Sequence, residues 1–383
     1  MSADAAPPFL ERAREAVKRK SSAPMWALMF ESVVRGITGI VLIALLYIVM
    51  TTIWHGAPRL DWEFISQPPR DGMMKGGVFP AIFGTVFVVL FMIAMALPLG
   101  VFGAVYMVEY AKGGAFSRIT RAAVNNLAGV PSIVFGLFGL GFFVLFVGKN
   151  LDYYVYDIPR NEVETKAWEI RVAPQVQAAR DEAIKAADEK SLRGSGRGAF
   201  IKDYVSGRAP TIRKKVFGQG AMFWAAATLA ILVLPVIIVS TEEALRSVPR
   251  SLREAAYGLG ATKWQVISTV VLPQARTGIL TGAILAIARG AGELAPILFV
   301  GVAFSMPGLP LTEPVNFGLF KIPVVNPFSE FMHLNYHIYT MATQQTNPEL
   351  ARPIQFATTL VLLMITLAMN FGAILLRRHY SRK

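Results

Sequence analysis

The chain of 383 residues contains no cysteine, and only 16% of its residues are charged. Without cysteine it has no disulfide bonds, no thiolate chemistry and no metal site with cysteine ligands. Soluble domains carry about 25% charged residues, so the low charge excludes an ordinary soluble domain. The chain instead has 54% hydrophobic residues and a mean hydropathy of +0.47. This composition predicts a membrane protein with several spanning segments.

Acidic residues are fewer than basic ones, and the net charge is +13. In a soluble chain this excess would suggest nucleic-acid binding. No basic stripe alternates with aromatic residues, however, as a nucleic-acid surface requires. The basic residues lie beside the apolar segments, so we expect membrane lipid and no nucleic acid as the neighbour.

The chain also lacks a G-x-x-x-x-G-K-[ST] phosphate loop, which excludes a nucleotide site of that kind. His333 and His337 are four residues apart, but no carboxylate–histidine zinc motif surrounds them. We therefore expect no metal site and no nucleotide cofactor bound by this chain.

Six apolar runs are long enough to cross roughly 30 Å of hydrocarbon as helices. They cover residues 37–54, 79–108, 123–147, 221–239, 278–300 and 355–376. Pro98 and Pro131 lie inside the second and third runs, where neighbouring helices can satisfy the carbonyl groups that proline frees. The first run is longer than the core of a signal peptide and has no obvious cleavage site, so we expect it to remain as an anchor. The sequence predicts an all-α integral membrane protein with six transmembrane helices.

Basic residues orient these spans. They cluster before the first span, between the second and third, between the fourth and fifth, and after the sixth. The residues are Arg12, Arg14, Lys18, Arg19, Lys20, Lys112, Arg118, Arg121, Arg246, Arg250, Arg253, Lys263, Arg276, Arg377, Arg378, Arg382 and Lys383. With six spans, all four clusters fall on one side, which the positive-inside rule makes the cytoplasm. Both termini are then predicted to be cytoplasmic.

The spans divide the chain into seven predicted segments. These are 1–35, a cytoplasmic segment; 36–77, the first span and an external loop; 78–148, spans two and three; 149–217, an extracytoplasmic insertion; 218–300, spans four and five with a hairpin at 241–276; 301–354, an external loop; and 355–383, the last span and a basic tail.

The insertion has its own pattern. Residues 162–190 are rich in Ala, Glu and Lys and predict a helix. Residues 193–198 read Arg-Gly-Ser-Gly-Arg-Gly and predict a flexible break. The insertion either contacts an extracytoplasmic partner or is a tolerated surface loop.

Two short helices are predicted between spans four and five. Ser247 can cap the first helix, with Pro249 in its first turn. Gly260 can end it through a positive φ. Thr262 and Gln265 form a capping box at the start of the second helix. Leu272-Pro273 is expected to end that helix.

The same hairpin carries residues at a characteristic spacing. They are Glu254, Ala255, Ala256, Gly260, Val270, Leu272 and Pro273. The two alanines let another surface approach the helix backbone, and Glu254 offers a carboxylate to that surface. The spacing resembles the EAA loop of ABC-importer permeases, with Val270 where isoleucine is usual. The resemblance implies that a separate ATPase couples to the chain through these residues.

Span five carries two ionisable residues. Gly278, Gly282, Ala286 and Gly290 form a small-residue row that allows close helix contact. Beside this row, Arg289 and Glu293 are four residues apart and can pair. An ionisable group inside a membrane is a functional candidate by default, although the pair can also be a structural salt bridge.

The functional alternative favours one substrate class. A guanidinium group suits the oxygens of phosphate or sulfate. A nearby carboxylate such as Glu293 repels a fully ionised oxyanion but accepts a hydrogen bond from one that keeps a proton, as phosphate does near neutral pH. Glu242 can supply a second acceptor, or it is a solvated loop carboxylate. Ser132 can offer a hydroxyl to the same path, or it serves packing.

Three stretches narrow the resemblance. They are residues 126–139 in span three, 241–249 before the hairpin and 288–296 in span five, and they resemble phosphate ABC-importer permeases of the PstA type. Some family members carry an arginine near the inner end of span four, where this chain has Val239. Many carry Gly-Glu-Thr, where this chain has Leu294 after Glu293.

The resemblance implies the rest of the assembly. The fold would be the type I (MetI-like) permease fold with an insertion between helices three and four, in a bacterial inner membrane. The chain would be a non-catalytic subunit. Its partners would be two copies of an ATP-binding subunit that holds ATP and Mg, a second permease of the PstC type, and an extracytoplasmic phosphate-binding protein. Inorganic phosphate would pass Arg289, Glu293, Glu242 and Ser132.

Three alternatives remain open at this stage. The chain can be the PstC-type companion permease, or a permease for another oxyanion such as sulfate or molybdate. It can be an ion-driven secondary transporter, although no inverted repeat is visible. It can also be a membrane scaffold, which would not need a buried arginine.

Overall fold

The computed structural model describes residues 25–111, 114–208, 215–306, 308–311, 315–317, 320–322 and 324–381. Most of the predicted N-terminal segment, including Arg12, Arg14, Lys18, Arg19 and Lys20, lies outside the described residues. So do Lys112, Arg382 and Lys383.

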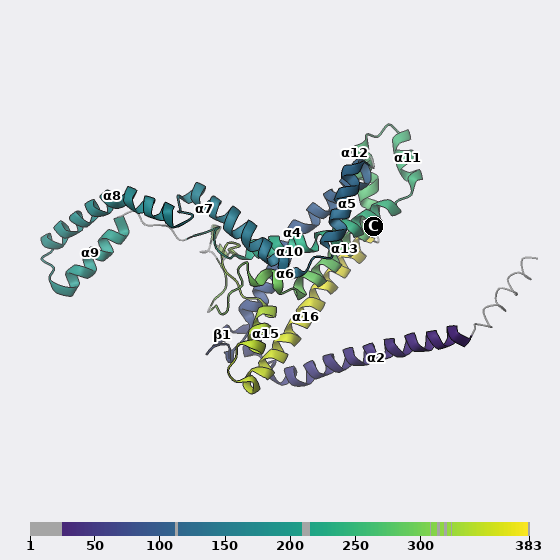
Figure 1. Cartoon of the computed structure of the whole chain (residues 1–383), viewed down its shortest axis with the longest axis horizontal. Helices are drawn as coiled ribbons and strands as arrows, with labels where there is room; N and C mark the ends of the chain where they lie inside the picture. The colour runs from purple at the N-terminus through teal and green to yellow at the C-terminus, as the bar shows by residue number, and fades with distance from the viewer. Residues whose placement is uncertain are drawn as a thin grey trace, which may run out of the picture.

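The described chain is almost entirely helical (Figure 1). Its elements are α2 (Met25–Gly56), η1 (Ala57–Arg59), α3 (Trp62–Ser66), β1 (Pro69–Arg70), β2 (Lys75–Gly76), α4 (Phe79–Val105), η2 (Tyr106–Tyr110), α5 (Ala115–Leu127), α6 (Ser132–Phe138), η3 (Gly139–Gly148), α7 (Lys149–Tyr156), α8 (Glu162–Glu189), α9 (Gly194–Arg208), α10 (Met222–Ser247), α11 (Arg250–Gly258), α12 (Lys263–Gln265), η4 (Val266–Val271), α13 (Leu272–Gly292), α14 (Ala295–Leu298), β3 (Val315–Phe317), β4 (Phe320–Ile322), α15 (Leu334–Thr343) and α16 (Pro348–Ser381). Each strand pair forms a short antiparallel ribbon.

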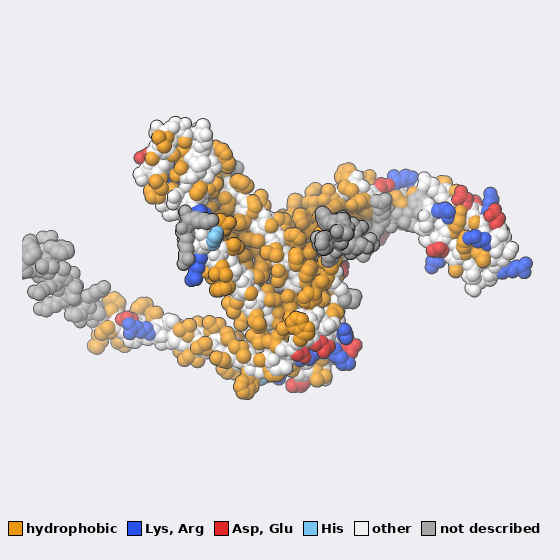
Figure 2. All heavy atoms as spheres, turned by 180° about the vertical axis from the view of Figure 1, so that it is seen from behind, with side chains coloured by type: hydrophobic (Ala, Val, Ile, Leu, Met, Phe, Trp, Pro, Cys, Tyr) orange, Lys and Arg blue, Asp and Glu red, His pale blue; other side chains and the backbone are white. Residues whose placement is uncertain are grey.

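Within the described residues, six helical stretches are long and apolar enough to cross a membrane, as predicted. They are Met25–Arg59, Phe79–Tyr110, Ser132–Tyr156, Met222–Ser247, Lys263–Gly292 and Pro348–Tyr380. Figure 2 shows hydrophobic side chains over most of the bundle surface and along α2, and charged side chains gathered on the projecting arm of α8 and α9. An apolar surface of this extent matches a lipid environment.

Helix α10 is the most buried of the six spans and packs against both α4 and α13. Its apolar residues Leu229, Val233 and Ile237 are buried in the largest core cluster. The predicted small-residue row of α13 lies on this contact. A Cβ atom added at Gly278 would lie 2.4 Å from the Ala244 Cβ, which shows how closely the two backbones approach. Such close contact drives helix association where lipid is as apolar as the protein.

Span three begins later than predicted. Residues 115–127 form the separate helix α5, and the spanning helix runs from Ser132 to Tyr156. Pro131 breaks the chain between them, with an extended backbone at φ −56° and ψ 137°. Proline disfavours helical geometry in the residue before it, so Pro131 ends one helix instead of kinking it.

The helix of span three continues to Tyr156, eight residues into the segment predicted as the insertion. Asp157 has a φ of +53° and ends α7. One turn earlier, the buried carboxylate of Asp152 accepts the backbone amides of Phe217 at 2.8 Å and Gly218 at 2.7 Å, which closes the base of the insertion. The predicted helix over 162–190 is confirmed by α8. The predicted break at 193–198 is wrong in extent, because α9 begins at Gly194, which has a φ of +61°.

Span five differs from the prediction at both ends. Leu272-Pro273 does not end the second hairpin helix, since helix continues from Lys263 to Gly292. Residues 266–271 adopt the wider π-helical geometry of η4 just before Pro273, a common way for a helix to accommodate a local irregularity. The other end of the span comes at Gly292, because Glu293 has extended backbone angles. The predicted helix over 278–300 is therefore interrupted, and the short helix α14 follows.

The predicted external loop at 301–354 is partly a packed element. Helix α15 lies against α16 and α4. His333 caps it by accepting the Asn335 amide at 3.2 Å, and Thr85 of α4 accepts the Leu334 amide at 3.0 Å. These contacts bring α15 into the bundle beside the end of α13.

Candidate functional site

Arg289 and Glu293 lie where α13 ends inside the bundle. The Arg289 Nε is 3.5 Å from the Glu293 Oε1, and the two side chains are 34% and 21% exposed. Arg289 is in the last turn of its helix and not at its middle. Its depth is nevertheless central, because the neighbouring Gly290 packs against Met92 of α4 and Val233 near the middle of α10.

Asn335 fixes the backbone around this pair. Its Nδ2 donates to the carbonyls of Ala291 and Glu293, each at 3.1 Å. The side chain is buried, and its Oδ1 has no hydrogen-bond partner within the described part of the chain. These hydrogen bonds join residues more than 40 positions apart in the chain, so no local sequence pattern could predict them.

Ser132 begins the helix α6, which contacts the segment that follows the pair. Its helix α6 packs against α14 through Gly136, whose added Cβ would meet the Ala295 carbonyl at 2.7 Å. Ser132 is one turn before Gly136. Over the described residues, no hydrogen bond links Ser132 to Arg289 or Glu293.

Glu242 does not contact Arg289 within the described residues. It lies in the helix α10 and not in a loop. It is buried in α10, nine residues beyond Val233, which is about 14 Å along a helix axis at 1.5 Å per residue. Its Oε1 accepts from Arg246 at 2.6 Å and from Arg121 of α5 at 2.9 Å. The structure therefore separates the four predicted path residues into an Arg289–Glu293 pair, Ser132 at the start of α6 and a distinct Glu242 cluster.

The Glu242 cluster borders two pockets at the end of the bundle that carries α11 and α12, here called the hairpin end. The larger is an open pocket of about 540 Å³, and its lining includes Arg121, Arg246, Arg250 and Arg253. We call it the basic pocket. A smaller pocket of about 250 Å³ shares Arg121 and Arg246 with it and reaches Val239. Arg121 of α5 thus lines the same small pocket as Val239 of α10.

The hairpin itself largely has the predicted structure. Gly260 has a φ of +81°, and the Thr262–Gln265 capping box is present. Ser247 is not the cap of α11, since Pro249 takes that position and the Ser247 hydroxyl donates to the Ala244 carbonyl at 2.8 Å.

One face of the hairpin is left uncovered by the rest of the described chain. Glu254 and Ala255 are exposed and Ala256 is half-buried. Leu259 of the turn is 90% exposed, and Trp264 of α12 is also exposed. An acidic residue among exposed apolar side chains is the composition expected of a surface that another protein covers. Leu272 and Pro273 lie farther along, inside the continuous helix of span five.

The opposite face of the hairpin is tied to span two. The Arg253 guanidinium forms an ion pair with Glu109 of η2 and donates to the Leu245 carbonyl at 2.6 Å. Lys263 donates to the Glu109 carbonyl and lies 4.5 Å from the ring centroid of Tyr110. Glu109, which sequence reasoning missed, therefore holds both helices of the hairpin.

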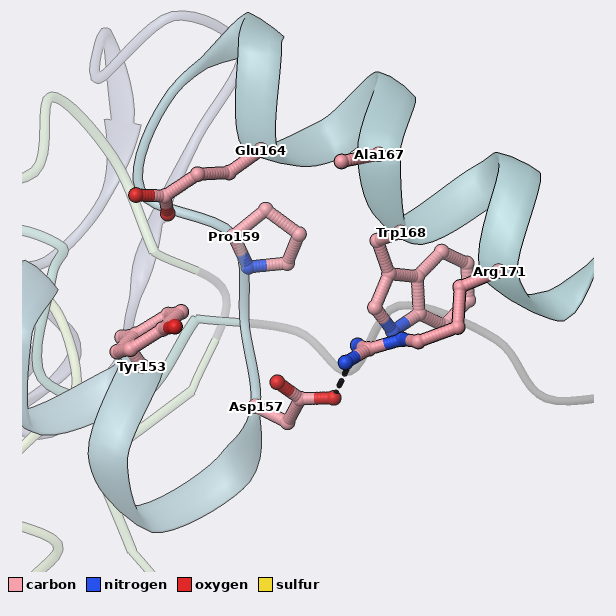
Figure 3. A pocket seen from close by; sticks show the side chains of 7 residues that line it. All are labelled: Tyr153, Asp157, Pro159, Glu164, Ala167, Trp168 and Arg171. Carbon is pink, nitrogen blue, oxygen red and sulfur yellow. Dashed lines mark hydrogen bonds and ion pairs between the residues drawn. The ribbon is translucent and has the colours of Figure 1, made fainter.

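A third pocket, of about 190 Å³, lies at the base of the arm (Figure 3). Arg171 donates to Asp157 across it at 2.5 Å. At its edge Arg160 binds Glu164 at 2.6 Å and stacks 4.2 Å from the Tyr153 ring centroid. The hydrogen bond from Arg160 lowers the pKa of Glu164. These contacts fix the start of α8 to the end of α7.

His333 and His337 have structural partners. Besides capping α15 through His333, the pair packs against α16, where the His337 Nδ1 lies 3.2 Å from the Thr358 hydroxyl. Burial lowers the pKa of His333 to about 3 and that of His337 to about 4. Both rings are therefore neutral at pH 7.

The chain is similar in sequence to known proteins. Residues 96–383 match the family described as "Binding-protein-dependent transport system inner membrane component". The chain is 31% identical to the phosphate transport system permease protein PstA of Mycobacterium leprae over 87% of this chain and 81% of that protein. It is 28% identical to PstA of Haemophilus influenzae over 76% of this chain and 79% of that protein. A solved bacterial ABC transporter involved in the import of alginate is similar at 14% identity and a TM-score of 0.48, over 94% of this chain and 98% of that chain.

Proposed function

This chain belongs to the family of binding-protein-dependent transport system inner membrane components, and on that premise we propose that it is the permease subunit of an ATP-driven importer of inorganic phosphate. It is a multi-pass inner membrane protein and a non-catalytic subunit. The predicted type I permease fold with six spans is confirmed by family membership and by the six apolar helices. Phosphate as the substrate follows from relatives named as phosphate permeases over most of their length.

The family implies two kinds of partner, an ATPase and a substrate-binding protein. In the finer proposal, two copies of the ATPase hold ATP and Mg, and a PstC-type permease completes the path. The uncovered face with Glu254, Ala255 and Leu259 is the proposed ATPase contact. Gly260, with a φ of +81°, lies in the turn between the two hairpin helices, and the proposal is that these helices move as one body.

The orientation follows from charge. The hairpin end carries the arginines of α5, α10 and α11, and the positive-inside rule assigns it to the cytoplasm. The arm of α8 and α9 then projects on the extracytoplasmic side, and both termini are cytoplasmic. The arm's contact partner there is proposed to be the phosphate-binding protein.

Arg289 carries the proposed substrate contact. It lies at mid-depth, is one-third exposed, and has a single 3.5 Å ion pair among its described neighbours. A guanidinium group has five N–H donors, so Arg289 can bind an oxyanion while still paired with Glu293. Glu293 accepts a hydrogen bond from the proton that phosphate keeps near pH 7, which favours phosphate over sulfate.

Weak binding of phosphate at Arg289 suits a site on a transport path. A conduction site must hold its ion strongly enough to admit it and weakly enough to release it. A single arginine beside a carboxylate meets both conditions. Asn335 supports the geometry by holding the two backbone carbonyls next to the pair.

Transport by the reconstituted complex tests the proposal. The chain would be purified with its ATPase and companion permease, placed in proteoliposomes and supplied with the binding protein and radiolabelled phosphate. We expect uptake that requires ATP and the binding protein and that excess sulfate does not inhibit. Uptake driven by a proton gradient without ATP, or uptake of sulfate or molybdate in preference to phosphate, would contradict it.

A further inference from the structure

The basic pocket at the hairpin end carries more positive than negative charge. Four arginines line it, from α5, α10 and α11. Two carboxylates pair with three of them, since Glu242 binds Arg121 and Arg246 and Glu109 binds Arg253. Arg250 is exposed and has no ion pair within the described residues. The charge of the cluster is therefore about two positive units, which matches a doubly charged anion.

One of the arginines in the basic pocket does not have all of its hydrogen bonds satisfied. The Arg121 Nε is buried and has no hydrogen-bond partner among the described residues. A buried donor without a partner is unfavourable, because it has lost its hydrogen bonds to water. An oxyanion in the pocket would supply acceptors to Arg121 while Glu242 keeps one oxygen on Arg246.

The pocket also lies in line with the proposed path. The smaller pocket that shares Arg121 and Arg246 reaches Val239. Val239 is six residues from Val233, the α10 residue level with Arg289, which is about 9 Å along the helix axis. The basic pocket thus continues toward the hairpin end from a point one to two turns beyond Arg289.

We infer that the basic pocket is a second oxyanion site, which binds the phosphate group at the cytoplasmic end of the path. The inference rests on the proposed function. It extends the proposed path from one phosphate site, at Arg289, to two successive sites, at Arg289 and in the basic pocket. Arg250 and Arg121 supply the main donors, and Arg253 connects the site to the hairpin. Because Arg253 also binds Glu109, occupancy of the site is linked to the position of α11.

Glu242 acts here as an internal competitor. Its carboxylate occupies donors of Arg121 and Arg246 that an oxyanion would otherwise use. Removing its charge should therefore strengthen anion binding, whereas removing an arginine should weaken it. These opposite signs separate a binding role from general loss of folding.

The test measures phosphate binding to the purified complex in an Arg289→Gln background, so that binding at Arg289 does not contribute. The complex would be held in nanodiscs of neutral lipid, without binding protein or nucleotide, and titrated with radiolabelled inorganic phosphate. We expect saturable binding that weakens about tenfold in Arg250→Gln, as the loss of one charge-assisted hydrogen bond predicts. Glu242→Gln should bind severalfold more tightly. Arg118→Gln on the exposed side of α5 is the matched control and should bind unchanged.

A second arm separates free phosphate from a lipid headgroup, which presents the same chemistry. The titration would be repeated in nanodiscs that contain phosphatidylglycerol. Unchanged phosphate affinity identifies the free ion as occupant. Loss of phosphate binding, with phosphatidylglycerol retained by Arg118→Gln and released by Arg250→Gln in native mass spectrometry, identifies the headgroup.

The inference is overturned if the Arg289→Gln complex binds no phosphate, or if Arg250→Gln and Arg118→Gln bind it equally. Either result leaves the proposed function intact when the unmodified complex still imports phosphate. Absence of import by the unmodified complex would instead contradict the proposed function.

Discussion

Arg253 of α11 pairs with Glu109 of η2, although 144 residues separate them in the chain. Both side chains are largely buried, at 19% and 9% exposure. Since η2 continues α4, the ion pair joins the hairpin to span two. A displacement of the hairpin by an ATPase would therefore pass directly to the helix that packs against α10 and α13.

Breaking this pair should uncouple transport from ATP hydrolysis. Arg253→Gln and Glu109→Gln each leave one partly buried charge without its partner, which weakens such contacts by about 2 kcal/mol or more. We expect phosphate uptake per ATP hydrolysed to fall, with the ATPase still bound. The charge-swapped double variant Arg253→Glu, Glu109→Arg should recover part of the uptake. A double variant no better than either single variant would argue against a link through this pair.

Gly260 should be required for ATPase association. Its φ of +81° is unfavourable for any residue with a Cβ, by about 1–2 kcal/mol. Gly260→Ala should therefore distort the hairpin and reduce co-purification of the ATPase. Gly258→Ala is the control, because Gly258 is helical and open space surrounds its Cβ position. Equal co-purification of both variants would contradict the prediction.

Gly278 should be required for packing of α13 on α10. Its added Cβ would lie 2.4 Å from the Ala244 Cβ, and overpacking of this kind is unfavourable by about 1–3 kcal/mol. Gly278→Ala should lower the unfolding temperature of the purified chain. Gly141→Ala, where nothing lies within 4 Å, should leave it unchanged. A drop of the same size in both would show that the close contact is not the cause.

Local patterns predicted a large part of this fold. Six apolar runs gave the correct number of spans, and the Thr262–Gln265 box and Gly260 gave the correct hairpin turns. These features depend on residues close in sequence. The two prolines show what local patterns could not predict. Pro131 lies at a break between two helices, whereas Pro273 lies within a continuous helix. Which of the two occurs depends on packing against other helices, and the local sequence does not reveal that packing.

Contacts between distant segments accounted for most of what the sequence could not predict about the site. Glu242 was predicted to be a second acceptor or a solvated loop carboxylate, whereas in the structure it is buried and pairs with Arg121, 121 residues away in the chain. Asn335 and Glu109 were missed because their contacts lie more than 40 residues away in the chain. Only the Arg289–Glu293 pair, which lies within one helical turn, was predicted from spacing.

The histidines at α15 should make the fold sensitive to acid. Burial lowers the pKa of His333 to about 3 and of His337 to about 4, from an ordinary value of 6.5. Below pH 6.5 the unfolded chain therefore takes up protons that the folded chain does not, and stability falls as the pH drops from 6.5 toward 4. Unfolding temperatures from pH 7 to pH 4.5 would show this decline. The slope should be shallower in His337→Gln than in the unmodified chain; an equal slope in both would contradict the assignment.

The most direct test of the account compares Arg289→Gln with Arg276→Gln on the same helix. Both variants would be purified in the full complex and assayed for ATP-dependent phosphate uptake in proteoliposomes. We predict that Arg289→Gln assembles normally but loses uptake by about 100-fold or more, as removal of a charge-assisted anion contact implies, while Arg276→Gln retains uptake. Uptake by Arg289→Gln at the rate of the unmodified complex would contradict the central claim that phosphate passes this guanidinium group.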